Sequence, residues 1–330
     1  MAATALAGDI GGTKTNLALY ELAGAPAVRR EASFASARYG SLEEVIADFL
    51  RDDRPPIAAA AFGIAGPIVD EAVSTTNLPW RIEAASLRRV LETPRVRLLN
   101  DLEATAFGAL FLPEDRFEVL NPGRARAGNR AVIAAGTGLG QGFLFWDGQR
   151  HVPVATEGGH VDFAPRDATE SALLAFLRRE YDRVSYERVV SGPGLFNVFR
   201  FLSEGEGRPV AAEVRRRLAD TRDPGAVIGE AGIAGTCSTC VAAVDMFVDL
   251  YGAQAGNLAL TIMAVGGVYV GGGIVTKMRR KIGEGAFMRS FIAKGRYSDF
   301  MADISVRVIL DPKTALLGAA EAARALLAAR

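Results

Sequence analysis

Apolar positions in the first third of the chain switch between the period of a strand and the period of a helix. Apolar segments at 57–63 and 96–99 predict strands, and an apolar helical period covers 42–51. Ser41 with Glu44 three positions later predicts a capping box at the start of that helix. This order of elements predicts an α/β layered domain with a mostly parallel centre.

The pattern begins again beyond residue 112. A strand at 131–135, a glycine turn at 136–140 and a strand at 142–146 repeat a device that also opens the chain. Helical sequence then dominates, broken at Gly192-Pro193-Gly194, before the last strand and helix, expected at 304–309 and 315–329. We therefore expect a small α/β domain, 1–112, completed by the C-terminal helix 315–330, and a large α/β domain, 113–314.

The opening device is a strand, a turn with two glycines and a second strand, written Asp9-Ile10-Gly11-Gly12-Thr13-Lys14-Thr15. Adjacent glycines leave backbone N–H groups uncovered, so such a turn can close around phosphate oxygens, and Asp9 beside it could hold a metal ion. The stretch from Gly8 nearly matches a P-loop, but Thr13 replaces the second glycine and a strand follows instead of a helix. An ordinary glycine-rich β-turn is the alternative.

Charge and composition favour a small-molecule partner. The 330 residues carry 38 basic and 38 acidic side chains, so no general attraction to nucleic acid or to an anionic membrane is expected. The basic clusters at 215–217 and 277–281 have no interleaved aromatic residues and are interpreted as solvated surface.

The charge-free run 253–275 is long enough to span a membrane, but its glycines divide it into a helical piece, 257–265, and a strand, 268–270. No basic segment precedes an apolar stretch at the N-terminus, so no secretory signal and a cytoplasmic location are expected. Cys237 and Cys240 cannot complete a four-ligand zinc site and are interpreted as buried thiols in preference to a redox pair.

Polar residues with possible chemistry follow the strand at 96–99. Asn100 and Asp101 would face the ligand crevice that forms at the carboxyl ends of parallel strands. Either residue would also make a good N-cap for the helix that begins there, so one could cap while the other reaches a ligand.

Glu157 and His160 lie on a turn made flexible by paired glycines. A carboxylate and an imidazole together can read the hydroxyl groups of a sugar, and this interpretation is favoured over zinc because few other ligands are present. Glu187 precedes a helix start and could be a surface carboxylate, since spacing alone does not bring it to Glu157. Gly271-Gly272-Gly273 would admit a flat ring or would form a tight strand-to-helix turn.

Taken together, these motifs resemble the bacterial glucokinase family over nearly the whole chain, with 157–165 and 187–194 the most specific segments. The resemblance implies an α/β, two-domain actin-like (ribonuclease H-like) ATPase fold with an interdomain cleft. It also implies that ATP and Mg²⁺ are used, that the γ-phosphoryl group is transferred to the 6-hydroxyl of glucose, and that the protein is a homodimer.

Carried over by position, the resemblance assigns Asp101 as the catalytic base and gives the other residues binding roles. Mg²⁺ would be held through water by Asp9. The sugar would be held by Asn77, Asn100, Asp101, Glu157, His160 and Glu187, and the nucleotide by Asp9, Gly11, Gly12, Thr13, Lys14, Gly136, Thr137, Gly138, Gly271, Gly272 and Gly273.

Two departures and two alternatives accompany this resemblance. The related ROK sugar kinases follow a similar histidine turn with a zinc-binding cysteine cluster, whereas here no cysteine follows His160 until Cys237, so no zinc is expected. Lys14 replaces an uncharged residue found in some members. The alternatives are a kinase of another hexose, such as mannose or glucosamine, and a non-enzymatic nucleotide switch of the actin or chaperone type.

Overall fold

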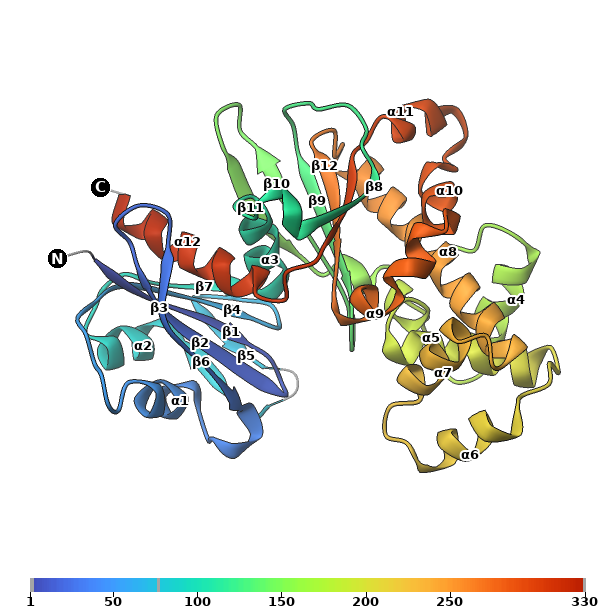
Figure 1. Cartoon of the computed structure of the whole chain (residues 1–330), viewed down its shortest axis with the longest axis horizontal. Helices are drawn as coiled ribbons and strands as arrows, with labels where there is room; N and C mark the ends of the chain where they lie inside the picture. Colours follow the sequence, from blue (N-terminus) through green and yellow to red (C-terminus); the bar gives the residue numbers. More distant parts are fainter. Residues whose placement is uncertain (1–2, 76–77, 329–330) are drawn as a thin grey trace. The chain divides into compact units, whose positions relative to one another are not determined.

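A computed structural model describes residues 3–75 and 78–328 of the chain (Figure 1). By internal contacts the chain divides into two compact units, each with its own sheet and core. Residues 142–155, which the sequence analysis assigned to the large domain, are grouped with the first unit. Unit 1 comprises Met1–Phe117, Gly142–Ala155 and Asp311–Arg330, and unit 2 comprises Glu118–Gln141 and Thr156–Leu310.

Unit 1 is built on a five-stranded sheet in the order β3-β2-β1-β4-β7. The neighbours β1, β4 and β7 run parallel, whereas β2 and β3 are added as antiparallel hairpin strands. The parallel centre expected from the sequence is confirmed. The strands are β1 (Thr4–Ile10), β2 (Lys14–Glu21), β3 (Ala27–Ala35), β4 (Ile57–Ile64) and β7 (Val96–Asn100), with a separate two-stranded sheet of β5 (Ala72–Ser74) and β6 (Arg81–Glu83).

Side chains alternate across the sheet of unit 1, and the two faces are covered differently. Leu6 and Ile10 of β1 pack in the core with helices α1 (Leu42–Phe49) and α2 (Ala84–Leu91). Ala5 and Ala7 face the other core, with α3 (Asp101–Ala109) and α12 (Thr314–Ala328). Figure 1 shows these two helix pairs on opposite faces of the sheet.

Small residues let α12 and α3 approach each other at backbone distance. A Cβ at Gly318 of α12 would lie 1.8 Å from the carbonyl oxygen of Ala104, and one at Gly108 of α3 would lie 2.0 Å from the carbonyl oxygen of Thr314. Neither obstacle is a flexible side chain, so the helices must separate to admit even a methyl group.

We therefore expect Gly318→Ala to destabilise the protein by about 1–3 kcal/mol through overpacking, although alanine is the better helix former. Thermal and urea denaturation of the variant measure this loss. Gly24→Ala is the control, because a Cβ at Gly24 meets no atom within 4 Å. Equal stability of Gly318→Ala and the wild type would contradict the close helix contact.

Unit 2 contains most of a six-stranded sheet in the order β11-β10-β9-β12-β13-β8, in which β9, β12 and β13 run parallel. The strands are β8 (Phe117–Asn121), β9 (Arg130–Ala135), β10 (Leu139–Trp146), β11 (His151–Thr156), β12 (Gly267–Gly271) and β13 (Val306–Ile309). The helices are α4 (Ala168–Leu177), α5 (Gly192–Arg200), α6 (Ala212–Asp220), α7 (Pro224–Ile233), α8 (Ser238–Thr261), α9 (Gly273–Gly283), α10 (Ala286–Ile292) and α11 (Ser298–Ala302).

The charge-free run divides as expected. It supplies the end of α8 and all of β12, although α8 begins much earlier than the helical piece predicted at 257–265. Within 3–75 and 78–328, no single helix is long and apolar enough to cross a membrane, and only α7 and α8 together pass that test, as a pair bent by 100°. Cys237 and Cys240, at the start of α8, are buried free thiols, as predicted.

Two local predictions need correction, the capping box of α1 and the start of the last strand. Ser41 does cap α1, accepting the N–H of Glu44 at 3.3 Å, but the Glu44 carboxylate binds the N–H of Gly40 at 2.8 Å instead of completing the capping box on Ser41. The last strand begins at Val306, two residues later than predicted, because the N–H of Ile304 still donates to the carbonyl of Met301 at 3.2 Å, in the turn that ends α11.

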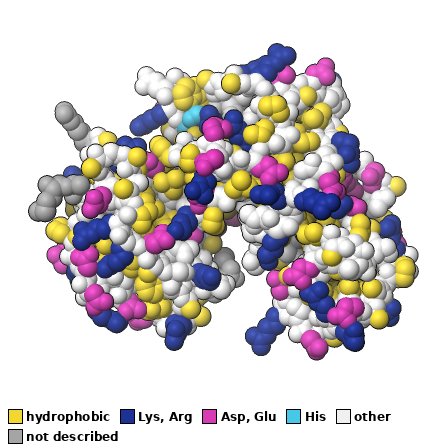
Figure 2. Space-filling model, in the orientation of Figure 1, with side chains coloured by type: hydrophobic (Ala, Val, Ile, Leu, Met, Phe, Trp, Pro, Cys, Tyr) yellow, Lys and Arg dark blue, Asp and Glu magenta, His cyan; other side chains and the backbone are white. Residues whose placement is uncertain are grey.

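The two basic clusters are matched by nearby acids. Arg217 pairs with Glu230 at 2.5 Å, and Lys281 lies 2.7 Å from Asp245 and 3.0 Å from Glu284. Basic and acidic side chains are interspersed over the face shown in Figure 2. Such exposed pairs contribute little to stability, and they leave no broad field of one sign there.

Candidate active site

A tight glycine turn joins β9 to β10 in unit 2, as the sequence predicted. The N–H of Gly136 donates to the carbonyl of Gly138 at 2.8 Å, and the carbonyl of Gly136 accepts the N–H of Gly192 at 2.8 Å. Thr137 is exposed at the tip. A Cβ at Gly138 would lie 2.5 Å from Oε2 of Glu187, so a larger residue would displace that carboxylate.

The glycines at 271–273 make the turn from β12 into α9. Gly272 has a φ of +97°, and a Cβ there would lie 2.2 Å from the carbonyl oxygen of Ala135, so glycine is required on both grounds. Gly271 pairs in parallel with Ala134, which places this turn beside the β9–β10 turn. No side chain caps the first N–H groups of α9, an arrangement that suits an anion.

Tyr251 of α8 fixes both strand ends from inside the core. Its hydroxyl accepts the N–H of Ala135 at 3.2 Å and lies 3.1 Å and 3.2 Å from the carbonyl oxygens of Ile133 and Gly271. The side chain is fully buried, and burial raises the pKa of Tyr251 far above its usual range. The sequence analysis missed this residue, whose only signal was a single tyrosine in a mainly apolar helix.

Glu157, His160 and Glu187 converge in unit 2. His160 lies between the two carboxylates, with Nε2 3.9 Å from Oε2 of Glu157 and Nδ1 3.9 Å from Oε1 of Glu187. Both distances are longer than a hydrogen bond, so the imidazole and each of the two carboxylates can bind a hydroxyl group of a ligand. The second carboxylate oxygen of Glu187 accepts the N–H of Leu139 at 3.0 Å, which connects the cluster to the β9–β10 turn.

Two short helices carry this cluster and are tied together through their flanks. Glu157 immediately precedes η3 (Gly158–His160), and His160 ends it. Glu187 lies in η4 (Tyr186–Arg188). The carbonyl of Val161 accepts the N–H of Tyr186 at 3.0 Å. The fold thus places Glu187 and Glu157 on either side of His160, a proximity that their spacing in the sequence did not predict.

In unit 1 the opening hairpin is braced by Ser36. The N–H of Gly11 donates to the carbonyl of Lys14 at 2.9 Å, and the Ser36 hydroxyl donates to the carbonyl of Gly11 at 2.8 Å. The N–H of Ser36 donates to the carbonyl of Thr13 at 3.1 Å, while the side chains of Thr13 and Lys14 are exposed. The strand–turn–strand prediction is confirmed, and Ser36 is a support that the sequence analysis missed.

Asp9, at the end of β1, is a half-buried carboxylate. Burial raises the pKa of Asp9, and a hydrogen bond from Nδ2 of Asn16 at 3.3 Å partly opposes that effect. A carboxylate that is desolvated in this way has a chemistry that suits a hydrated divalent cation.

We expect Asp9→Asn to stabilise the protein at neutral pH while it impairs function. A raised folded-state pKa gives stability that is complete below the unfolded pKa and is lost as pH rises through the folded value. The stability difference between Asp9→Asn and the wild type should therefore grow as pH rises above about 4 in metal-free buffer. Thermal denaturation across that range measures it, and a pH-independent difference would contradict it.

Asn100 ends β7 and is the N-cap of α3. Its Oδ1 accepts the N–H groups of Leu102 at 2.9 Å and Glu103 at 3.4 Å, and Glu103 returns a bond to the N–H of Asn100 at 3.3 Å. Nδ2 of Asn100 donates to the carbonyl of Gly66 at 3.3 Å. The capping alternative raised by the sequence is therefore confirmed for Asn100.

Asp101 is the first residue of α3, with Oδ1 accepting the N–H of Leu102 at 2.9 Å. It follows β7, whose Leu99 pairs with Gly63 of β4, which in turn pairs with Asp9 of β1. Asp9 and Asp101 thus come from the carboxyl ends of parallel strands at one edge of the unit 1 sheet, where ligands bind in open α/β sheets.

The remaining features to be placed are Asn77, a possible metal site and a cavity. Asn77 lies outside the described residues. In the part of the chain that the structure describes, no three or more His, Cys, Asp or Glu side chains are grouped so as to hold a metal ion. A cavity of about 370 Å³ in unit 1, lined by Arg88, Arg97 and Leu326 among others, includes none of the predicted site residues.

The comparisons with known proteins agree with one another. A family model described as Glucokinase matches residues 6–326. A protein named Glucokinase from Nostoc sp. strain PCC 7120 is 39% identical over 332 residues, which cover 96% of this chain and 97% of the relative. The chain belongs to the glucokinase family.

Solved structures agree with that membership. The crystal structure of glucokinase from an Antarctic psychrotroph is 29% identical, with a TM-score of 0.85 over 98% of this chain and all of the other. A ROK family glucokinase from Streptomyces griseus, 20% identical, covers 98% of this chain and 100% of its own with a TM-score of 0.65 and shares the fold.

Membership of the glucokinase family sets the fold class and the reaction class. The fold is the mixed α/β, two-domain actin-like ATPase fold that the resemblance implied. The family members are phosphotransferases that act on a hydroxyl group of glucose, and the function of this chain is ATP-dependent phosphorylation of glucose.

Proposed function

We propose that this member of the glucokinase family transfers the γ-phosphoryl group of ATP to the 6-hydroxyl of glucose, giving glucose 6-phosphate and ADP. The observation that supports it most is the convergence of Glu157, His160 and Glu187 in unit 2. Two carboxylates around one imidazole supply acceptors and a donor at positions that suit adjacent sugar hydroxyls.

Asp101 is proposed as the general base. A sugar hydroxyl is a weak nucleophile at neutral pH, and a carboxylate within hydrogen-bond reach can take its proton as the new O–P bond forms. Asn100 makes the N-cap of α3, and Asp101 beside it carries a carboxylate at the end of β7. Asn100 is proposed to contribute to sugar binding at the end of β7, and Asn77 is proposed as a sugar ligand on the family resemblance.

The phosphates are proposed to bind the glycine turns at 11–13 and 136–138, and the adenosine to bind at 271–273. The β9–β10 turn and the start of α9 lie side by side, and both offer backbone N–H groups to anionic oxygens. The Streptomyces griseus protein that shares the fold is in complex with glucose and AMPPNP, which fits ATP as the donor here.

Asp9 is proposed to hold Mg²⁺ through water, and Lys14 to lie by the phosphates. The half-buried carboxylate of Asp9, desolvated and bonded to one amide, fits a hydrated cation better than direct multi-ligand coordination. Mg²⁺ bound to the nucleotide would neutralise charge that develops on the transferred group.

The competing functions differ in what they require. A kinase of mannose or glucosamine would share every group above, whereas an actin-like or chaperone-like nucleotide switch gives no reason for the cluster of Glu157, His160 and Glu187. A steady-state panel of glucose, mannose and glucosamine with ATP, GTP and polyphosphate separates them. Turnover with no hexose would overturn the proposal in favour of the switch.

We propose a cytoplasmic location, as the sequence analysis expected, and a homodimer, as the family resemblance implies. Sedimentation velocity of the purified protein tests the second, since a monomer at micromolar concentration would contradict it.

A further inference from the structure

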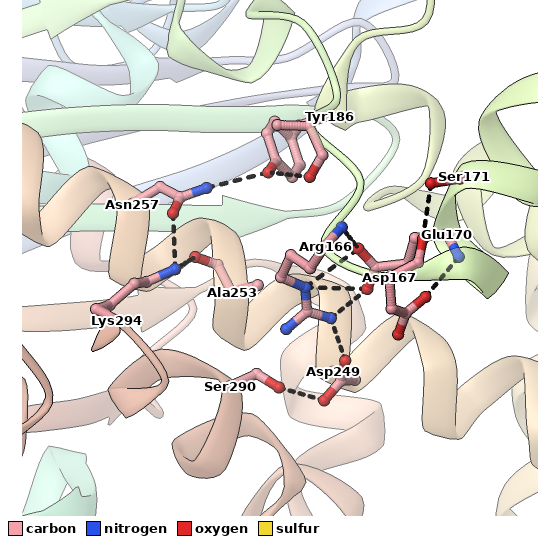
Figure 3. A network of polar contacts seen from close by, with 11 residues as sticks. Arg166, Asp167, Glu170, Ser171, Tyr186, Asp249, Ala253, Asn257, Ser290 and Lys294 are labelled. Carbon is pink, nitrogen blue, oxygen red and sulfur yellow. Dashed lines mark hydrogen bonds and ion pairs between the residues drawn. The ribbon is translucent and has the colours of Figure 1, made fainter. Parts of the chain in front are cut away.

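A chain of hydrogen bonds in unit 2 leads from Lys294 to the segment that carries Glu187 (Figure 3). Nζ of Lys294, just after α10, donates to Oδ1 of Asn257 on α8 at 2.7 Å and to the carbonyl of Ala253 at 2.9 Å. Nδ2 of Asn257 donates to the hydroxyl of Tyr186 at 3.0 Å. Tyr186 immediately precedes Glu187 in η4.

The order of donors and acceptors fixes the Asn257 amide in one orientation. An ammonium group only donates, so Lys294 selects the amide oxygen and turns Nδ2 toward Tyr186. The Tyr186 hydroxyl oxygen accepts this hydrogen bond, and its O–H donates to the carbonyl oxygen of Ala164 at 3.5 Å. Without the ammonium, Oδ1 loses this donor and the orientation depends on the second bond of Nδ2, which donates to Oε1 of Gln254 at 3.1 Å.

Tyr186 in turn positions both short helices of the sugar cluster. Its N–H donates to the carbonyl of Val161, the residue after His160, at 3.0 Å. Its ring packs edge-on against Phe163, with centroids 5.4 Å apart. Because Glu187 follows directly in the chain, a displacement of Tyr186 would move Glu187 and the flank of His160 together.

The surface of α8 leaves room for the side chain of Lys294 at Gly256. A Cβ at Gly256 of α8 would lie 2.6 Å from Cε of Lys294 and 2.6 Å from the carbonyl oxygen of Phe291. Glycine at that position therefore allows the lysine stem to lie directly on the helix. A half-buried amine held by an amide and a carbonyl is a fixed part of the structure, unlike a fully exposed lysine.

The charges that act on Lys294 come from the neighbouring part of the network. Burial and the positive charge of Arg166 lower the pKa of Lys294 to about 8, and Glu170 opposes them. Arg166 is itself held by Glu170 and by Asp249 of α8, which accepts the hydroxyl of Ser290 (Figure 3). Lys294 therefore begins to lose its proton within an accessible pH range.

We propose that Lys294 and Asn257 are positioning residues of the glucose subsite, which hold Tyr186 and, through it, the carboxylate of Glu187 and the turn of His160. This inference rests on the proposed role of Glu187 and His160 as sugar ligands. It adds two residues, from α8 and from the segment after α10, that sequence patterns did not connect with the sugar.

The test compares steady-state kinetics of Lys294→Met and Asn257→Leu with those of the wild type. Both variants keep the bulk of the side chain and remove the hydrogen bonds to the next member. We expect the KM for glucose to rise about tenfold and the KM for ATP to stay within about twofold, because only the sugar ligands shift. Ser290→Ala is the matched control: it removes a bond in the same network, off the route to Tyr186, and should change neither constant.

A pH profile separates positioning from general destabilisation. In the wild type the KM for glucose should rise as pH passes about 8, where the Lys294 ammonium is lost. Lys294→Met should already be at the high value and should not show this step. Tyr186→Phe, which retains the ring and its packing, provides a second variant that should reproduce the higher KM.

Three results would contradict the positioning role of Lys294. Unchanged glucose KM in folded Lys294→Met and Tyr186→Phe, equal rises for glucose and ATP, or a Ser290→Ala effect of the same size would overturn the positioning role. Absence of hexose phosphorylation by the wild type would instead overturn the proposed function, so the two failures are distinguishable.

Discussion

Asp101→Asn is expected to lower kcat for glucose phosphorylation about 10²- to 10⁴-fold, the range that a positioned general base contributes. The amide retains an oxygen that can accept the N–H of Leu102, as Oδ1 of Asp101 does, but it cannot take a proton. The KM for glucose should change little, since the proposed loss occurs in the transition state. A coupled assay of glucose 6-phosphate formation measures both constants.

The fold should survive this change because Asn100, and not Asp101, caps α3. Glu43→Gln in the first turn of α1 is the control for loss of an acid near a helix start in the same unit, and it should leave kcat unchanged. Near-normal turnover in Asp101→Asn would remove Asp101 from the reaction, whatever the behaviour of the control.

Glu187→Ala is expected to have the second largest effect, because this carboxylate has two partners. One oxygen faces His160 at 3.9 Å and the other accepts the N–H of Leu139, next to the β9–β10 turn, at 3.0 Å. Loss of a charged hydrogen bond to the sugar should lower kcat/KM for glucose roughly 10- to 150-fold. The unpaired Leu139 amide should also raise the KM for ATP several-fold.

Glu157→Gln provides the comparison. Glu157 lies on the other side of His160, half exposed, and should affect glucose alone. If Glu187→Ala leaves the KM for ATP unchanged, its bond to Leu139 does not support nucleotide binding. If both variants leave glucose kinetics unchanged, the cluster does not bind the sugar.

Local features of this chain were accessible from the sequence because they depend on neighbours. The Asp9–Thr15 hairpin follows from paired glycines before an alternating segment, and the start of α5 follows from the Gly192-Pro193-Gly194 stretch. The sequence also identifies cap and ligand as the two possible roles of Asn100, and the structure shows the cap.

Features that depend on long-range packing were not accessible. Glu157 and Glu187 are separated by a helix in sequence, and their side chains meet at His160 because backbone bonds such as Tyr186 to Val161 and Phe163 to Val184 join the two segments. The pairing of Glu44 with Gly40 depends on a side-chain rotamer that a motif does not specify. Ser36 and Tyr251 are single polar residues whose partners lie far away in the sequence, Ser36 on the opening hairpin and Tyr251 at the ends of β9 and β12.

The position of α12 along the chain has a consequence for the order of folding. The alanine-rich face of the first sheet, with Ala5 and Ala7, is covered in part by α12, which begins only at Thr314, after every strand of both units. Until Thr314–Ala328 has been synthesised, α3 covers that face without α12, whereas all of unit 2 precedes Asp311. The sheet that contains the first strand is therefore completed late, and the nascent chain carries an apolar surface that chaperones can bind until α12 is made.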